Sequence, residues 1–220
     1  MNAPVEPRTR RGRETREAIV RAARRRFIAD GYLNVSVPAI TKDAGRAQGS
    51  FYTYFDSKAH LLHVLASEAI DRMAARFERV LAEELEPAAL VDRMTAAVWD
   101  AYREDIAVLV SVYQTATRDL VLDDWTRMRE VVVTAVVEVD RRAVAAGAPA
   151  PDDELATART IASMLESSCF TWITERPDSP AVTETAIGAT LGVPTLAAMW
   201  TAMLRIPRAP GARRRRAQPV

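Results

Sequence analysis

The sequence is poor in the residues that most often carry covalent and acid–base chemistry. Its 220 residues include one cysteine and two histidines. Because Cys169 stands alone, the chain has no internal disulfide framework, and we expect an inert thiol in a reducing, cytoplasmic compartment. Arginines stand near the N-terminus without an apolar stretch behind them, which is not the pattern of a secretory signal.

The motifs of common enzyme classes are missing as well. The sequence contains no P-loop, no dinucleotide-binding glycine pattern, no nucleophile elbow and no HExxH pattern. His60 and His63 have a spacing that can place two imidazoles on one helix face, yet no cysteine or acidic cluster completes a metal site there. We therefore predict a protein that is not an enzyme and that has neither a metal nor a cofactor. Acidic residues paired in a cleft keep an enzyme as the alternative.

Long uncharged stretches are scarce, and one of them has the length of a membrane span. Residues 185–204 carry no charge over twenty positions. Gly188, Gly192 and Pro194 dilute its apolar content, and amphipathic order survives in its second half. We expect this stretch to be buried in protein rather than in lipid.

Aromatic residues make up only 6% of the chain, whereas alanine, leucine, valine, glutamate and arginine are abundant, a composition that favours helices. Apolar residues recur at helical spacing, and capping or stopping residues separate the stretches. We predict an all-α protein of about nine helices. Their approximate ranges are 13–30, 36–44, 48–55, 57–85, 87–102, 106–113, 124–146, 152–176 and 194–205.

The net charge is only +1, but its distribution along the chain is uneven. Residues 1–58 hold 12 basic and 6 acidic side chains, whereas residues 59–212 hold 14 basic and 23 acidic ones. Four arginines, Arg213 to Arg216, follow in the C-terminal tail. A basic N-terminal part before an acidic body indicates that nucleic acid meets one end of the molecule only.

Residues 36–62 have the layout of a helix-turn-helix. Ser36 can cap a short helix in which Ile40 and Ala44 lie four apart, and Gly45 can adopt the positive φ that ends it. Two phenylalanines, also four apart, place the next helix against the same small core. The outer face of that second helix is polar and aromatic, as a helix lying in a major groove requires. Its side chains are Gln48, Ser50, Tyr52, Thr53 and Tyr54.

Residues 13–62 resemble the DNA-binding domain of the tetracycline-repressor (TetR) family. Ten positions match the family pattern at fixed spacing: Ile40, Ala44, Gly45, Gly49, Ser50, Tyr52, Tyr54, Phe55, Ser57 and Lys58. Two positions depart from it. Arg46 replaces a small apolar residue after the glycine, and Ala47 replaces the usual hydroxyl cap of the third helix.

The resemblance implies a set of DNA contacts on this chain. We expect Gln48 and Ser50 to contact base edges. Phosphate contacts are expected from Arg13, Arg16, Ser36, Thr41, Arg46, Tyr52, Tyr54 and Lys58. Arginines of the N-terminal arm would add to them.

The resemblance also implies a division of the chain into four parts. These are a disordered basic arm (1–12), a helix-turn-helix domain (13–58), a ligand-binding and dimerisation domain (59–206) and a basic, disordered tail (207–220). The body is expected to hold a mostly apolar effector cavity, with Glu166 as a further possible polar contact. Its expected lining is Trp99, Tyr102, Tyr113, Trp125, Met128, Met164, Ser168 and Trp172. Aromatic and methionine side chains at helical spacing are also typical of an ordinary core, and that alternative stays open.

The predicted function is that of a homodimeric, sequence-specific transcriptional regulator. We expect a repressor that a small hydrophobic effector releases from a near-palindromic operator, with pairing through the last two long helices and no membrane contact. An activator and a DNA-binding protein without sequence preference are the alternatives. The operator, the effector, the regulated genes and the role of the C-terminal arginines are not encoded in any pattern that we can interpret.

Overall fold

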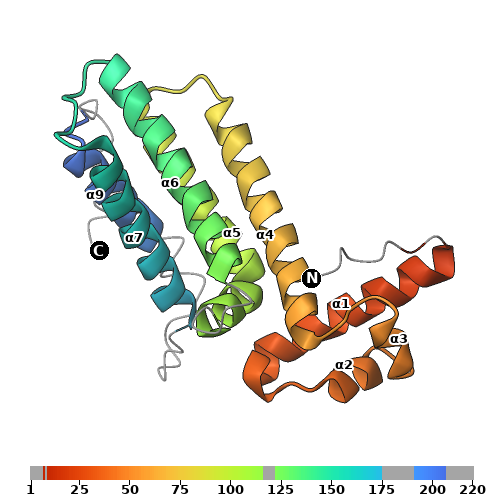
Figure 1. The fold of residues 1–220 in the computed structure, drawn as a ribbon. Coiled ribbons are helices and arrows are strands. Elements are labelled where there is room, and N and C mark those ends of the chain that lie inside the picture. The colour runs from red at the N-terminus through yellow and green to blue at the C-terminus, as the bar shows by residue number, and fades with distance from the viewer. Residues whose placement is uncertain (1–6, 8, 116–121, 175–190, 207–220) are drawn as a thin grey trace, which may run out of the picture.

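The structure is a computed structural model that describes residues 7, 9–115, 122–174 and 191–206. Within these ranges all regular elements are helices, as predicted (Figure 1). They are α1 (Arg10–Asp30), the 3-10 helix η1 (Tyr32–Asn34), α2 (Val37–Asp43), α3 (Gly49–Tyr52), α4 (Lys58–Leu81), α5 (Pro87–Thr115), α6 (Leu122–Ala145), α7 (Glu154–Thr174) and α9 (Val193–Met203). The C-terminal tail and most of the predicted arm lie outside the described residues.

The first helix begins three residues earlier than its apolar stripe predicts. Thr9 has an extended backbone, and its side chain accepts a hydrogen bond from the Gly12 amide, so Thr9 is the N-cap. Arg10 and Arg11, which we assigned to the arm, therefore lie in the first turn of α1. Ser36 caps α2 as predicted, and Ser57 caps α4.

Two hydrophobic cores organise the molecule. The N-terminal core gathers α1, α2, α3 and the first half of α4 around side chains such as Ile19, Ile40, Phe51 and Phe55. The C-terminal core gathers the rest of α4 with α5, α6, α7 and α9. Figure 1 shows α4 running from the small N-terminal helices along the edge of the body, so this helix belongs to both.

The helix α5 also crosses between the cores. The sequence predicts separate helices over 87–102 and 106–113, and α5 is indeed two helical stretches joined by a kink at Asp105, whose φ and ψ are −115° and 16°. Beyond this kink, Val108 and Val112 pack into the N-terminal core, while Leu109 faces the C-terminal core. Residues 106–113 are therefore almost all apolar because this part of α5 is buried between the two cores.

The uncharged C-terminal stretch packs one face against protein in its described part. Trp200 of α9 is fully buried, and its Nε1 donates a 3.0 Å hydrogen bond to Oδ1 of the buried Asp140 in α6. Residues 185–190 of this stretch lie outside the described residues. None of the helices described is both long and apolar enough to cross a membrane.

The two histidines do not converge. The buried His60 accepts a hydrogen bond at Nδ1 from the Asp56 amide. His63 pairs through Nδ1 with Oδ2 of Asp124 at 2.8 Å, which ties α4 to the start of α6. Over the described ranges, no three side chains of the metal-binding types cluster in one place.

Candidate functional site

The short helix α3 presents its polar side to solvent. Phe51 is fully buried beneath it, whereas Tyr52 is 54% exposed and Gln48 is exposed at its start. No side chain caps α3, in keeping with alanine at position 47. The exposed surface therefore offers an amide, hydroxyls and a tyrosine, which suit base edges and phosphates.

A hollow of about 480 Å³ lies between the start of α1 and the α2–α3 turn. Arg11 of α1 and Arg46 of the α2–α3 turn both line it, and no acidic side chain among the described residues does, so the hollow is electropositive. Its remaining lining is Thr9, Gly12, Thr15, Gly45, Ala47, Ser50, Thr53 and Tyr54. The predicted Arg46, Ser50 and Tyr54 are thus brought together, and Thr15 joins them unpredicted. Thr15 lies one helical turn after Arg11 and so on the same face of α1, and this spacing could have predicted that it lines the hollow.

Two residues predicted to contact phosphates have other partners. Thr41 is 2% exposed, and its Oγ1 donates to the carbonyl oxygens of α2's first turn. The Lys58 Nζ donates to the carbonyl oxygens of Tyr32 and Val35, each at 2.7 Å, and lies over the Tyr32 ring. Burial lowers the pKa of Lys58. Thr41 stabilises its own helix, and Lys58 fastens η1 to α4.

Arg16 is likewise turned away from the exposed face. Its side chain is only 16% exposed, lies over the Phe55 ring and reaches Oε1 of Glu68 at 3.5 Å. Arg13 and Ser36, in contrast, are exposed. The difference follows from helical position, because Arg16 lies three residues before the buried Ile19 and shares its face.

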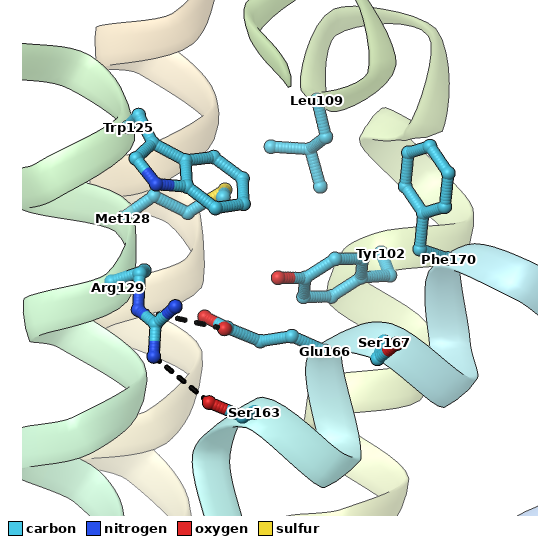
Figure 2. A pocket seen from close by; sticks show the side chains of 9 residues that line it. All are labelled: Tyr102, Leu109, Trp125, Met128, Arg129, Ser163, Glu166, Ser167 and Phe170. Carbon is cyan, nitrogen blue, oxygen red and sulfur yellow. Dashed lines mark hydrogen bonds and ion pairs between the residues drawn. The ribbon is translucent and has the colours of Figure 1, made fainter. Parts of the chain in front are cut away.

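The body contains a cavity of about 230 Å³ among α5, α6 and α7 (Figure 2). Leu109, Trp125, Met128 and Phe170 form its apolar wall. The polar wall consists of Tyr102, Arg129, Ser163, Glu166 and Ser167. Arg129 donates to Ser163 at 2.9 Å, and its Nε lies 3.9 Å from Oε2 of Glu166.

Burial dominates the electrostatics of this cavity. It raises the pKa of Glu166 to about 7, against the opposing effect of the Arg129 charge. The pKa of Tyr102 also lies well above its ordinary value, first because of burial and then because of the Glu166 charge. Burial raises the pKa of Cys169 to about 12, so its thiol stays protonated at neutral pH.

The structure brings some of the predicted ligand residues together and separates others. Tyr102, Trp125 and Met128 line the cavity, as does Glu166. The others do not line it: Trp99, Met164, Ser168 and Trp172. Trp172 lies so close to Gly192 that a Cβ there would approach its ring to 2.4 Å. The side chain of Tyr113 lies outside the described residues.

Two polar links run from the cavity's helices to the N-terminal core. In one, Asp124 at the start of α6, next to the cavity residue Trp125, pairs with His63 of α4. In the other, the carboxylate of Asp105 at the α5 kink accepts hydrogen bonds from Arg24 of α1 and from Arg72 of α4, the latter at 2.8 Å. A shift of α5 or α6 would therefore act on α1 and α4 directly.

The outer face of the last helices is apolar. Met199 and Met203 of α9 are 48% and 43% exposed, and Leu155 of α7 is 45% exposed. The segment Val193–Met203 has no charged residue. Figure 1 shows α7 and α9 together at one side of the body, away from α4.

Known proteins resemble this chain in both sequence and fold. Residues 19–65 match the family model of bacterial regulatory proteins of the tetR family. The transcriptional repressor KstR of Mycobacterium tuberculosis is 27% identical over 174 residues, which cover 78% of this chain and 77% of that protein. KstR of Mycolicibacterium smegmatis is 26% identical over 174 residues, covering 78% and 83%.

The fold agrees with these sequence matches. The crystal structure of the regulator PfmR from Thermus thermophilus superimposes with a TM-score of 0.66 at 21% identity, covering 87% of this chain and 99% of that one. The family model covers the stretch where an exposed recognition helix stands on a buried aromatic core. By the match over residues 19–65, by its relatives and by its fold, the chain is therefore similar to DNA-binding transcriptional regulators of the TetR family.

Proposed function

We propose that the protein is a repressor that binds a near-palindromic operator as a homodimer and leaves it when an effector enters the cavity of the body. The exposed polar face of α3 beside the electropositive hollow is the observation that carries the DNA-binding part. The repressor KstR of Mycobacterium tuberculosis, similar over most of the chain, supports repression rather than activation. The proposed division is a DNA-binding domain up to residue 58 and an effector-binding and dimerisation body after it.

In the proposed docking, Gln48 and Ser50 meet base edges at the floor of a major groove. The phosphate backbone is held around them by Arg11, Arg13, Arg46, Tyr52 and Tyr54. Thr41, Arg16 and Lys58 are left out because their polar atoms serve the fold. Ser36 keeps its place at the exposed start of α2.

Replacing Tyr52 by alanine should weaken operator binding by the dimer at least about 100-fold. Each half-site would lose a hydrogen bond to a charged phosphate, worth about 1.5–3 kcal/mol. Fluorescence anisotropy with a duplex carrying the operator, at fixed salt, measures the change. Ile28→Ala is the matched control, since Ile28 is 65% exposed at the opposite end of α1 from the hollow. Equal affinities for Tyr52→Ala and wild type would refute this docking.

Sequence preference is tested with unrelated duplexes. A regulator with base contacts should prefer its operator by a ratio of about 10³ or more at physiological salt. Equal affinity for operator and unrelated DNA, with a steep dependence on salt, would instead identify a protein that reads only the phosphate backbone.

The homodimer is proposed to form through α7 and α9. An uncharged helix with exposed methionines gains stability when a second copy covers it, because burial of apolar area drives association. Two recognition helices about 34–36 Å apart then meet successive major grooves.

The double variant Met199→Asp/Met203→Asp is expected to be monomeric. Two carboxylates per protomer would have to be buried without partners at the proposed interface. Light scattering after size exclusion measures the mass. Operator affinity should fall at least about 100-fold, since the second half-site loses its raised effective concentration. Ile28→Asp, an equal change on the N-terminal part, should remain dimeric; a dimeric double variant would exclude this interface.

Effector release is proposed to act through the two polar links. An occupant between Trp125 and Tyr102 would displace α6 against α5, and His63 and Asp105 would pass the displacement to α4 and α1. The effector changes operator affinity only to the extent that it binds the two arrangements unequally.

A further inference from the structure

The polar wall of the cavity contains two buried oxygens without a hydrogen-bond partner. They are Oη of Tyr102 and Oε1 of Glu166, whose side chains lie close enough to shift each other's pKa but not in hydrogen-bond geometry. The two residues are 2% and 6% exposed, so solvent does not serve these atoms. A buried polar atom without a partner costs about 1–3 kcal/mol. We therefore expect these two oxygens to gain hydrogen-bond partners when a ligand is bound.

Figure 2 shows where these atoms point. The Tyr102 hydroxyl is directed into the cavity, toward the space between Met128 and the Glu166 carboxylate. The second carboxylate oxygen of Glu166 faces Arg129, whose guanidinium also donates to Ser163. One donor from α5 and one acceptor from α7 are thus left on the same side of the cavity.

The rest of the cavity is apolar and small. Leu109, Trp125, Met128 and Phe170 surround the space opposite the two oxygens. Its volume is about 230 Å³. Water would satisfy the two oxygens but not the aromatic and aliphatic wall, which favours an apolar occupant.

We propose that the effector is a compact, uncharged, apolar compound with one hydroxyl group, held by Tyr102 and Glu166. The ligand hydroxyl donates to Oε1 of Glu166, and its oxygen accepts from the Tyr102 hydroxyl. This inference rests on the proposed function, since it names the ligand class of the effector cavity. One hydroxyl satisfies both orphaned oxygens, which neither a donor alone nor an acceptor alone would do.

Other polar groups fit the same place less well. A carboxylate would meet the negative charge of Glu166 and would have to displace it from Arg129. An ammonium group would enter an apolar cavity where Arg129 already offsets the Glu166 charge, so it would lose its hydration for little gain. A ketone would accept from Tyr102 but leave Oε1 of Glu166 unpaired.

The test compares three compounds with the same carbon chain, namely 1-octanol, octanoate and octylammonium, by isothermal titration calorimetry on the full chain at pH 8. We expect 1-octanol to bind at least tenfold more tightly than either ion. Tyr102→Phe should weaken 1-octanol about three- to tenfold, the value of a neutral hydrogen bond. Glu166→Gln should cut the preference for 1-octanol over octanoate to below a third of its wild-type value. Thr160→Ala, at an exposed position of α7 that does not line the cavity, should change neither.

The wild-type comparison alone decides the ligand class, so the inference does not depend on the folding of any variant. Tighter binding of octanoate or octylammonium, equal binding of all three, or no binding of any of them would overturn it. Failure of the proposed function is a separate result: 1-octanol would bind with the expected preference, yet operator affinity in its presence would not change. Circular dichroism of each variant checks that a lost preference is not lost folding.

Discussion

The Trp200→Ala variant is expected to be less stable than wild type by at least about 3–5 kcal/mol, the cost of removing a large aromatic side chain from a packed core. Trp200 is fully buried, and its hydrogen bond to Asp140 ties α9 to α6. The variant also removes the only donor that the structure gives to the buried Asp140 carboxylate within the described residues. Urea unfolding at a fixed protein concentration measures the loss, because dimer stability depends on concentration.

Two further variants separate packing from hydrogen bonding at this contact. Trp200→Phe keeps most of the ring and should cost less than Trp200→Ala, chiefly through the unpaired Asp140 carboxylate. Combining it with Asp140→Asn should recover part of that loss. If Trp200→Ala were no less stable than Trp200→Phe, the ring would not be an anchor.

The same carboxyl gives this contact a pH dependence of known sign. Burial raises the pKa of Asp140 to about 6, although the Trp200 hydrogen bond acts in the opposite direction. The folded state therefore holds this proton more tightly than the unfolded state, whose pKa is about 3.8. The stability that protonated Asp140 adds to the folded state is complete below about pH 4. As the pH rises through about 6 the protein loses this stability, which amounts to about 3 kcal/mol at most. Asp140→Asn should lack this decline; an identical pH profile would contradict the assignment.

The second large effect is expected at the α5 kink. Asp105→Ala should lower the free energy of unfolding by about 2–3 kcal/mol and weaken the response of operator binding to effector. Removal of one partner from a buried ion cluster costs about 3–5 kcal/mol. We expect a smaller loss of stability here because Arg24 and Arg72 are 27% and 47% exposed, so water can hydrate them once the carboxylate is gone. Denaturant unfolding and effector titration against operator measure the two parts.

Glu104→Ala is the matched control for this variant. Glu104 is the preceding residue of α5 and pairs with Arg76 of α4 at 2.6 Å, but the pair lies at the surface. Its removal should cost under about 1 kcal/mol and leave the effector response intact. If Asp105→Ala behaved like Glu104→Ala in both measurements, α5 would not transmit the signal. A double-mutant cycle with Arg24→Ala then assigns the coupling to the α1–α5 contact.

Local patterns were sufficient for much of the fold. The caps Ser36 and Ser57 act within three residues of their own position, so the starts of α2 and α4 follow from the sequence. The interruption at Asp105 also followed from the sequence, but its partners did not, because the arginines that bind it come from positions 24 and 72. A pattern read along one helix contains no information about such partners.

The same distinction explains the outcome for the site residues. Exposure on α3 was predictable, since the apolar period places Phe51 inward and Tyr52 outward. The family resemblance implied that Thr41 and Lys58 would contact phosphates, but nearby carbonyl oxygens take their donors. In the cavity, Arg129 and Phe170 were missed because which face of α6 or α7 meets α5 depends on helix packing.

By itself the sequence determined the helical class, the helix-turn-helix with its family resemblance and the basic character of the N-terminal end. These properties depend on spacing and charge along the chain, which folding does not change. Only the tertiary structure decided which polar groups are free to meet a ligand or DNA. Thr9 bonds an amide three residues away, but the partners of Lys58, Asp105 and Asp140 come from elements distant in sequence. At Asp105 and Asp140, burial and pairing therefore decide what the side chain can do more than its residue type does.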